Sequence, residues 1–277
     1  MLMSFLRHDG LKFRYADAGE GTPFVFQHGL GGDVDQPFSL FRPPPGFRLL
    51  AFDCRGHGET RPLGDPAKIG FVPFADDLLV LMDRLGLNRA VVGGISMGAG
   101  VALNFALRFP QRVAALVLAR PAWLDRPLPG NLEIYPRIAQ LIRRYGAREG
   151  LELFRQSKDY VTMKRLSSDT IASLVGQFEH PRAAETVVKL ERIAQDAPNR
   201  DRREWAAIQV PVLVLANQQD PIHPFEYGRT LAGGIPSAVF RELTPKSISR
   251  ERHALEVQRY AEEFLKHHFA KKGIVTC

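Results

Sequence analysis

Ser96 is the residue of this chain best suited to covalent chemistry. It lies at the centre of Gly-Ile-Ser-Met-Gly (residues 94–98), a G-x-S-x-G pattern between an apolar segment, 90–94, and a helix-forming segment, 101–107. A serine on so sharp a strand–helix turn is held in a strained backbone conformation with its hydroxyl exposed. Glycines two residues away on either side avoid a collision across the turn. The pattern therefore predicts a nucleophilic serine.

A serine hydroxyl is a weak nucleophile at neutral pH, so it needs a base and a group that orients the base. In enzymes with such an elbow, the acid and then the histidine follow the serine along the chain. Asp220 comes just after the apolar segment 210–216, and His253 comes after the next predicted strand, 238–243. We therefore predict Ser96, Asp220 and His253 as a catalytic triad at one edge of the sheet.

Two alternatives to this triad stay open. His223 lies close to Asp220 and competes for the role of base. We favour His253, because a base adjacent to its own acid rarely reaches a third group. Asp125 follows an earlier predicted strand, 113–119, and is an alternative acid. The remaining histidines, apart from His28, are expected on the surface or in loops. These are His8, His57, His180, His267 and His268. No spacing suggests a metal site.

A glycine-rich segment follows the first buried strand. The strand is predicted over 23–27 and leads into His28-Gly29-Leu30-Gly31-Gly32. Glycines let backbone N–H groups approach a ligand closely, so we expect the Leu30 N–H to form one wall of an oxyanion hole; a flexible turn is the alternative. His28 is expected to hydrogen-bond within the loop. The later turn at 53–58, Asp-x-Arg-Gly-x-Gly, is expected to be structural, with Arg55 pairing a carboxylate.

Strands and helices alternate through the first half of the chain, which predicts an α/β fold with a mostly parallel sheet covered on both faces. A hairpin at 4–17 precedes it. Between Pro121 and Val210 no convincing strand occurs, and four segments have helical character. These are 135–145, 150–156, 168–178 and 182–195. We therefore predict a core of residues 1–121 and 207–277, and a helical lid of residues 122–206 over the carboxyl edge of the sheet, where open α/β folds bind ligands.

Composition narrows the class of protein. The 277 residues are 45% hydrophobic and 24% charged, which is ordinary for a globular chain, and no apolar run is long enough to span a bilayer. The net charge is +7, but Lys and Arg are dispersed among acids, which argues against a nucleic-acid partner. We interpret this charge as an ordinary solvated surface, and a field that gathers an anionic substrate is the alternative. With two distant cysteines and no leader-like N-terminus, we expect a soluble cytoplasmic protein with no disulfide framework.

Taken in order along the chain, these motifs resemble those of α/β-hydrolases. The segments 28–32, 53–58 and 94–98, then Asp220 and His253, follow that family's sequence. The pentapeptide is similar to those of carboxylesterases and enol-lactonases. The resemblance implies Ser96 as nucleophile, His253 as general base, Asp220 as orienting acid, and the backbone N–H groups of Leu30 and Met97 as the oxyanion hole. One departure is Arg252-His253, where members often have Gly-His.

The resemblance implies a serine hydrolase that cleaves a small carboxylic ester or lactone through an acyl-enzyme, with no cofactor. A serine rather than an aspartate at the nucleophile argues against dehalogenase and epoxide-hydrolase chemistry. Carbon–carbon bond hydrolases of ring-fission products, cofactor-free haloperoxidases or perhydrolases, and a non-catalytic ligand-binding receptor are alternatives on the same fold. Three questions stay open at this point: which substrate is the natural one, whether the protein is a monomer or a homodimer, and whether the lid moves.

Overall fold

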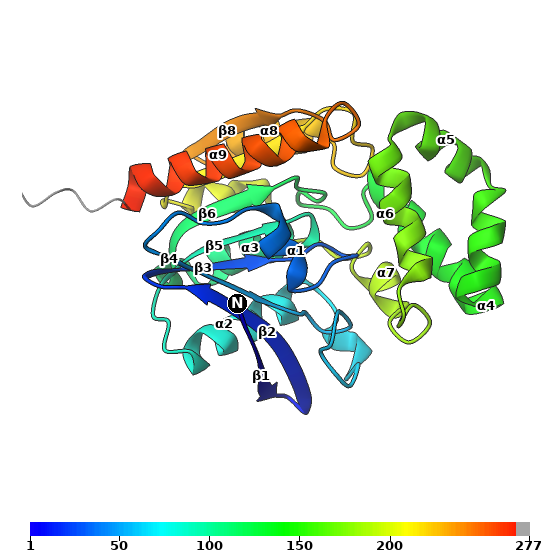
Figure 1. Ribbon diagram of the computed structural model, residues 1–277, viewed down its shortest axis with the longest axis horizontal. Coiled ribbons are helices and arrows are strands. Elements are labelled where there is room, and N and C mark those ends of the chain that lie inside the picture. Colours follow the sequence, from blue (N-terminus) through cyan, green and yellow to red (C-terminus); the bar gives the residue numbers. More distant parts are fainter. Residues whose placement is uncertain (270–277) are drawn as a thin grey trace, which may run out of the picture.

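The computed structural model describes residues 1–269, in which eight strands form one sheet in the order β1-β2-β4-β3-β5-β6-β7-β8 (Figure 1). The strands are β1 (Leu2–His8), β2 (Leu11–Gly19), β3 (Thr22–Gln27), β4 (Phe47–Phe52), β5 (Ala90–Ile95), β6 (Val113–Ala119), β7 (Val212–Asn217) and β8 (Ala238–Leu243). The helices are α1 (Asp35–Leu40), α2 (Phe71–Arg84), α3 (Met97–Arg108), α4 (Ile134–Arg155), α5 (Lys158–Leu166), α6 (Ser168–Glu179), α7 (Val188–Arg192), α8 (Phe225–Gly234) and α9 (Arg250–Phe269).

The sheet is antiparallel at its first edge and parallel elsewhere. β1 and β2 form the predicted hairpin, whose turn residues Asp9 and Gly10 have φ of 50° and 74°, and β2 pairs antiparallel with β4. All pairs from β4 to β8 are parallel. The carboxyl ends of β3, β5, β6 and β7 therefore meet at one edge, and this edge carries the loops that form the site. The predicted α/β class is confirmed.

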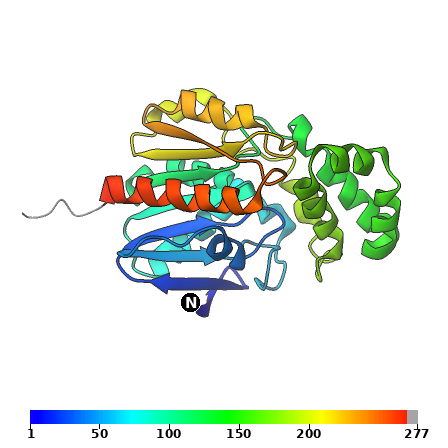
Figure 2. The ribbon, with the colours of Figure 1, turned by 45° about the horizontal axis from the view of Figure 1, so that its top comes forward.

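Alternating side chains cover both faces of the sheet. On β3, Val25 packs in the cluster that contains α2 and α3, whereas Phe24 and Phe26 pack in the cluster that contains α9. On β7, Val214 packs in the first of these clusters and Leu215 in the second. Strands with both faces buried are nearly continuous apolar runs, which is why the sequence located them closely. Figure 2 shows α9 lying across the sheet.

Helices α4 to α7 come between β6 and β7 along the chain, in the segment predicted as a lid (Figures 1 and 2). They stand beyond one end of the sheet. α4 joins two of the predicted helices across a kink at Gly146, which has φ of 77°. The exact division into core and lid at residues 122 and 206 stays a prediction. No helix among residues 1–269 is long and apolar enough to cross a membrane.

Candidate active site

Ser96 sits on a strained turn between β5 and α3. Its φ of 57° and ψ of −115° lie in a region that non-glycine residues rarely adopt. A Cβ at Gly94 would collide with the Gly98 backbone, and a Cβ at Gly98 would collide with the carbonyl oxygen of Gln27. The predicted reason for both glycines is therefore present in the structure, and the Ser96 side chain is left half-buried at the carboxyl edge of the sheet.

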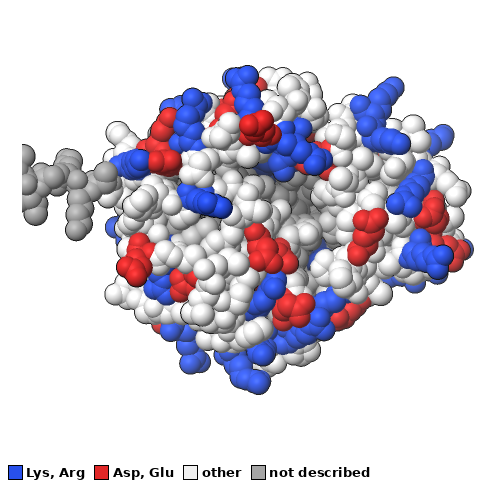
Figure 3. Space-filling view, viewed as in Figure 1, with Lys and Arg blue, Asp and Glu red and all other residues white. Residues whose placement is uncertain are grey.

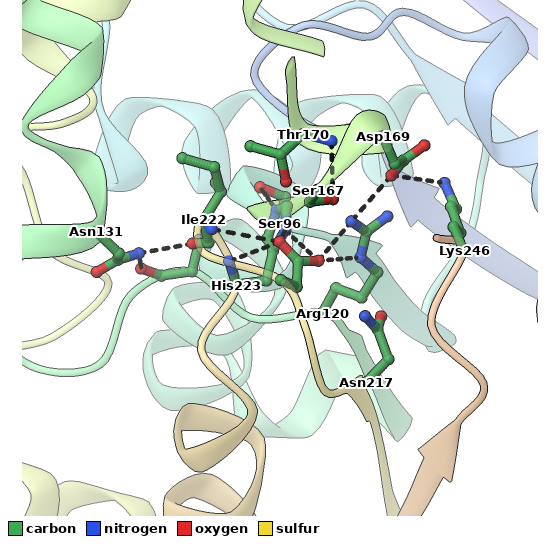
Figure 4. A network of polar contacts seen from close by, with 12 residues as sticks. Ser96, Arg120, Asn131, Ser167, Asp169, Thr170, Asn217, Ile222, His223 and Lys246 are labelled. Atoms are coloured by element: carbon green, nitrogen blue, oxygen red, sulfur yellow. Dashed lines mark hydrogen bonds and ion pairs between the residues drawn. The ribbon is translucent and has the colours of Figure 1, made fainter. Parts of the chain in front are cut away.

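His223 is the histidine that contacts the serine. Its Nε2 lies 2.9 Å from Ser96 Oγ, and its Nδ1 lies 3.0 and 2.9 Å from the two carboxylate oxygens of Asp220 (Figure 4). With Nδ1–H donating to Asp220, Nε2 accepts from the serine hydroxyl. Burial lowers the pKa of His223, Arg120 lowers it further, and Asp220 opposes both. The neutral imidazole that a general base requires is thus favoured.

The loop between β7 and α8 folds back so that His223 reaches the serine. Asp220 Oδ1 accepts hydrogen bonds from the backbone N–H groups of Ile222 (3.3 Å) and His223 (3.1 Å). This local turn places the imidazole directly over the carboxylate that orients it. Acid and base therefore come from one loop, three residues apart.

A buried arginine supports the acid. Arg120 follows β6, and its Nε donates to Asp220 Oδ2 at 3.0 Å; its second guanidinium nitrogen contacts the same oxygen. Burial alone would raise the pKa of Asp220, but His223 and Arg120 outweigh it and hold the pKa well below its usual range. Arg120 has φ of 46°, a left-handed conformation that costs an arginine about 1–2 kcal/mol. Arg120 is not among the residues predicted from the sequence, although a charge directly after a wholly apolar strand could have indicated it.

The structure does not bring His253 to Ser96; the imidazole at the serine is that of His223, which contradicts the predicted placement of His253 and makes His223 the candidate base. His253 is only 3% exposed, and its Nδ1 contacts the carbonyl oxygen of Thr244 at 2.8 Å. It lies in the first turns of α9 on the buried stripe that continues with Val257 and Ala261. Burial lowers the pKa of His253 to about 4. Residues spaced four apart on an amphipathic helix share its packed face, so this spacing indicates a structural histidine.

Asp125 also lies away from the imidazole. It accepts a hydrogen bond from Arg202 Nε at 2.8 Å, and both line a separate depression. Asp220, the acid predicted from the sequence, is therefore the carboxylate that contacts the histidine beside Ser96, although this histidine is His223 and not the predicted His253.

The glycine-rich loop after β3 lies against the serine. A Cβ at Gly29 would stand 3.4 Å from Ser96 Cβ. Among residues 1–269, neither the Leu30 N–H nor the Met97 N–H has a hydrogen-bond acceptor. Two backbone donors beside a serine are what an oxyanion hole requires. The predicted role of Leu30 and Met97 stays a proposal, supported by this placement.

The residues predicted to be structural hold the loops around the site. His28 Nδ1 contacts Gly29 O at 2.8 Å, and its Nε2 accepts from the Cys54 N–H at 3.0 Å, which confirms its local role. Arg55 donates twice to Asp77 at 2.7 Å, which confirms the predicted carboxylate pair. His57 lies in a loop, which is one of the two predicted positions, and is fully buried.

Ser96 and His223 line a cavity of about 340 Å³ between the core and the lid. This volume falls near the lower end of the range for small-molecule sites. Figure 3 shows the hollow, with Lys and Arg side chains on its upper margin. The core contributes Gly29, Leu30 and Ile95 to its wall, and α6 contributes Thr170 and Ser173. No group of three or more His, Cys, Asp or Glu that could hold a metal occurs within residues 1–269.

Comparisons with known proteins agree with this architecture. Residues 22–247 match the family model for the alpha/beta hydrolase fold. The chain is 28% identical over 250 residues to an AB hydrolase superfamily protein of Bacillus subtilis (strain 168), covering 83% of this chain and 84% of that one. It is 27% identical to a 2-hydroxymuconate semialdehyde hydrolase of Pseudomonas putida, covering 92% and 91%.

A solved structure extends the likeness to three dimensions. The enol-lactonase of Burkholderia xenovorans LB400 superposes with a TM-score of 0.72 at 26% identity, covering 95% of this chain and all of that one. Since the family model matches residues 22–247, which are most of the chain, this protein belongs to the alpha/beta hydrolase fold family.

Proposed function

We propose that the protein is a serine hydrolase that cleaves a carboxylic ester or a lactone through an acyl-enzyme on Ser96. The observation that carries this proposal is the continuous contact from Ser96 Oγ through His223 to Asp220, with each step between 2.9 and 3.0 Å. This is the arrangement that turns a serine hydroxyl into a nucleophile at neutral pH.

The reaction proceeds in two halves. His223 Nε2 takes the Ser96 proton as Oγ attacks the carbonyl carbon, and the Leu30 and Met97 N–H groups stabilise the oxyanion of the tetrahedral intermediate. The imidazolium, stabilised by Asp220, returns the proton to the departing alkoxide. Water then attacks the acyl-enzyme by the same route, and Ser96 is regenerated with release of the acid.

The relatives support hydrolysis but differ in the compound that they are named for. The enol-lactonase of known structure favours an ester-type bond. The 2-hydroxymuconate semialdehyde hydrolase, to which the chain is similar over 92% of its length, makes a semialdehyde a second candidate. Both substrates therefore belong in the first assay.

The test is hydrolysis of 4-nitrophenyl esters from acetate to octanoate, and of 2-hydroxymuconate semialdehyde, by the wild type and Ser96→Ala. We expect a burst of nitrophenol from the wild type. In Ser96→Ala, kcat should be lower by about 10⁴-fold or more. Ser4→Ala, on the outer strand β1, is the matched control and should behave as wild type. Turnover of the semialdehyde alone would favour the second candidate, and undiminished ester turnover by Ser96→Ala would refute the acyl-enzyme on Ser96.

A further inference from the structure

The cavity that holds Ser96 also carries two cations that the proposed mechanism does not use. Lys246, in the segment between β8 and α9, and Arg250, the first residue of α9, both line it. The Lys246 side chain is 27% exposed, so the lysine is largely withdrawn from solvent. Arg250 is exposed, and the ion pairs within residues 1–269 give it no acidic partner.

The charges around these two residues do not balance. Lys246 Nζ lies 3.7 Å from Asp169 Oδ2, which is also 3.4 Å from Arg120 (Figure 4). Arg120 is already bonded to Asp220. The two carboxylates, Asp169 and Asp220, therefore balance Arg120 and Lys246, and the unpaired Arg250 leaves one positive charge in excess. Asp169 is held between two cations, so its charge does not oppose an anion entering beside Lys246 and Arg250.

The crowding of these cations is unfavourable in the empty cavity. Burial lowers the pKa of Lys246, Arg120 and Arg250 lower it further, and Asp169 and Asp220 oppose them. Arg250 also stands in the first turn of α9, where the helix macrodipole disfavours a positive charge. A bound anion would relieve both repulsions.

We propose that Lys246 and Arg250 bind a carboxylate of the substrate while its ester or lactone carbonyl lies at Ser96. The inference rests on the proposed function and specifies its substrate class: a small ester or lactone acid. A single excess positive charge matches a carboxylate, and the guanidinium of Arg250 offers the paired donors that bind its two oxygens. The uncharged wall of Leu30, Ile95 and Ile222 surrounds the remainder of the substrate.

The test uses pairs of esters that differ only in charge. In the first pair the anionic ester carries its carboxylate on the acyl group: the 4-nitrophenyl monoester of adipic acid is compared with the same ester of adipamic acid. In the second pair the carboxylate is on the leaving group: 4-acetoxybenzoate is compared with 4-acetoxybenzamide. The ratio of kcat/KM for the anionic over the neutral ester is measured in wild type, Lys246→Gln, Arg250→Gln and the double variant. Arg229→Gln, on the exposed face of α8, removes the same charge outside the cavity and is the matched control.

In the wild type we expect a ratio about 10- to 100-fold in favour of the anion for at least one pair, as for a charge-assisted contact. Each single variant should lower this ratio, the double variant should abolish it, and Lys246→Arg should retain it. Arg229→Gln should keep the wild-type ratio. The preference should also fall as salt is added. A wild-type ratio near one for both pairs, or a preference that survives in the double variant, would overturn the proposal.

Binding separates this proposal from the proposed function. In Ser96→Ala, calorimetric titration compares the adipate and adipamate esters, with and without the double substitution. Preferential binding of the anion that depends on Lys246 and Arg250, with no Ser96-dependent hydrolysis of any ester, would uphold the anion site and refute the esterase proposal. Ser96-dependent hydrolysis without any anion preference would do the reverse.

Discussion

Substituting two histidines separately, His223 and His253, gives the sharpest test of the site. The order of residues along the chain favours His253 as the base, whereas the structure puts His223 Nε2 at 2.9 Å from Ser96 Oγ and turns His253 toward the Thr244 carbonyl. The variants His223→Ala and His253→Ala therefore have opposite expected effects: the first on catalysis, the second on stability.

The expected magnitudes follow from these contacts. Without His223 the serine has no proton acceptor, so kcat should fall about 10⁴- to 10⁶-fold, which corresponds to about 5–8 kcal/mol of transition-state stabilisation. Removing His253 breaks one buried hydrogen bond, which costs about 1–3 kcal/mol of unfolding free energy. At roughly 2–4 °C for each kcal/mol in a chain of this size, Tm should drop by about 2–12 °C.

Kinetics and melting measured on the same preparations decide the matter. We expect His253→Ala to keep kcat/KM for 4-nitrophenyl butyrate within about tenfold of wild type, since its ring touches no reacting group. His223→Ala should melt close to wild type yet be nearly inactive. The reasoning is refuted if folded His223→Ala keeps wild-type kcat while folded His253→Ala loses more than about 10³-fold.

Three further predictions concern Arg120, Asp220 and His253. Arg120→Gln removes a cation that lowers the pKa of His223, so the acid limb of the pH profile of kcat/KM should move to higher pH; an unmoved limb would show that Arg120 does not act on the imidazole. Asp220→Asn should lower kcat by about 10²- to 10⁴-fold through the wrong imidazole tautomer, and should also lower Tm because Arg120 loses its buried partner; unchanged kcat would remove Asp220 from the triad. The pKa of His253 is about 4 in the folded protein against about 6.5 unfolded, so the unfolded chain binds the proton more readily and stability falls from pH 6.5 to 4; His253→Gln should flatten this fall in Tm, and an equal slope would contradict it.

Much of the fold can be predicted from the sequence because buried parallel strands are recognisable as apolar runs. The predicted strand 113–119, for example, matches β6 residue for residue. The elbow around Ser96 is equally local: five residues and their two flanking elements determine its geometry. Where the information lies within one element and its turns, prediction from sequence alone succeeded.

The prediction of His253 beside Ser96 was wrong because the order of residues along the chain does not say where a side chain points. His253 follows the predicted strand 238–243, but α9 already begins at Arg250, where Ser249 Oγ accepts the Arg252 N–H at 3.1 Å. This start puts His253 inside the helix, on the stripe that faces the sheet. The reach of His223 depends on the turn closed by the side chain of Asp220, which spacing alone did not reveal.

The placement of the base has a consequence for the rest of the cavity. Because Asp220 and His223 share the loop between β7 and α8, the segment from Leu243 to Arg250 has no part in holding the imidazole. That segment instead brings Lys246 and Arg250 to the cavity wall, on the side where Arg120 and Asp169 link the core to α6. On the two proposals made above, the loop between β7 and α8 supplies the base and its acid, and the segment before α9 supplies the charge that selects the substrate. If this division holds, substitutions at Lys246 should change which esters are cleaved, whereas substitutions at His223 should change whether any ester is cleaved.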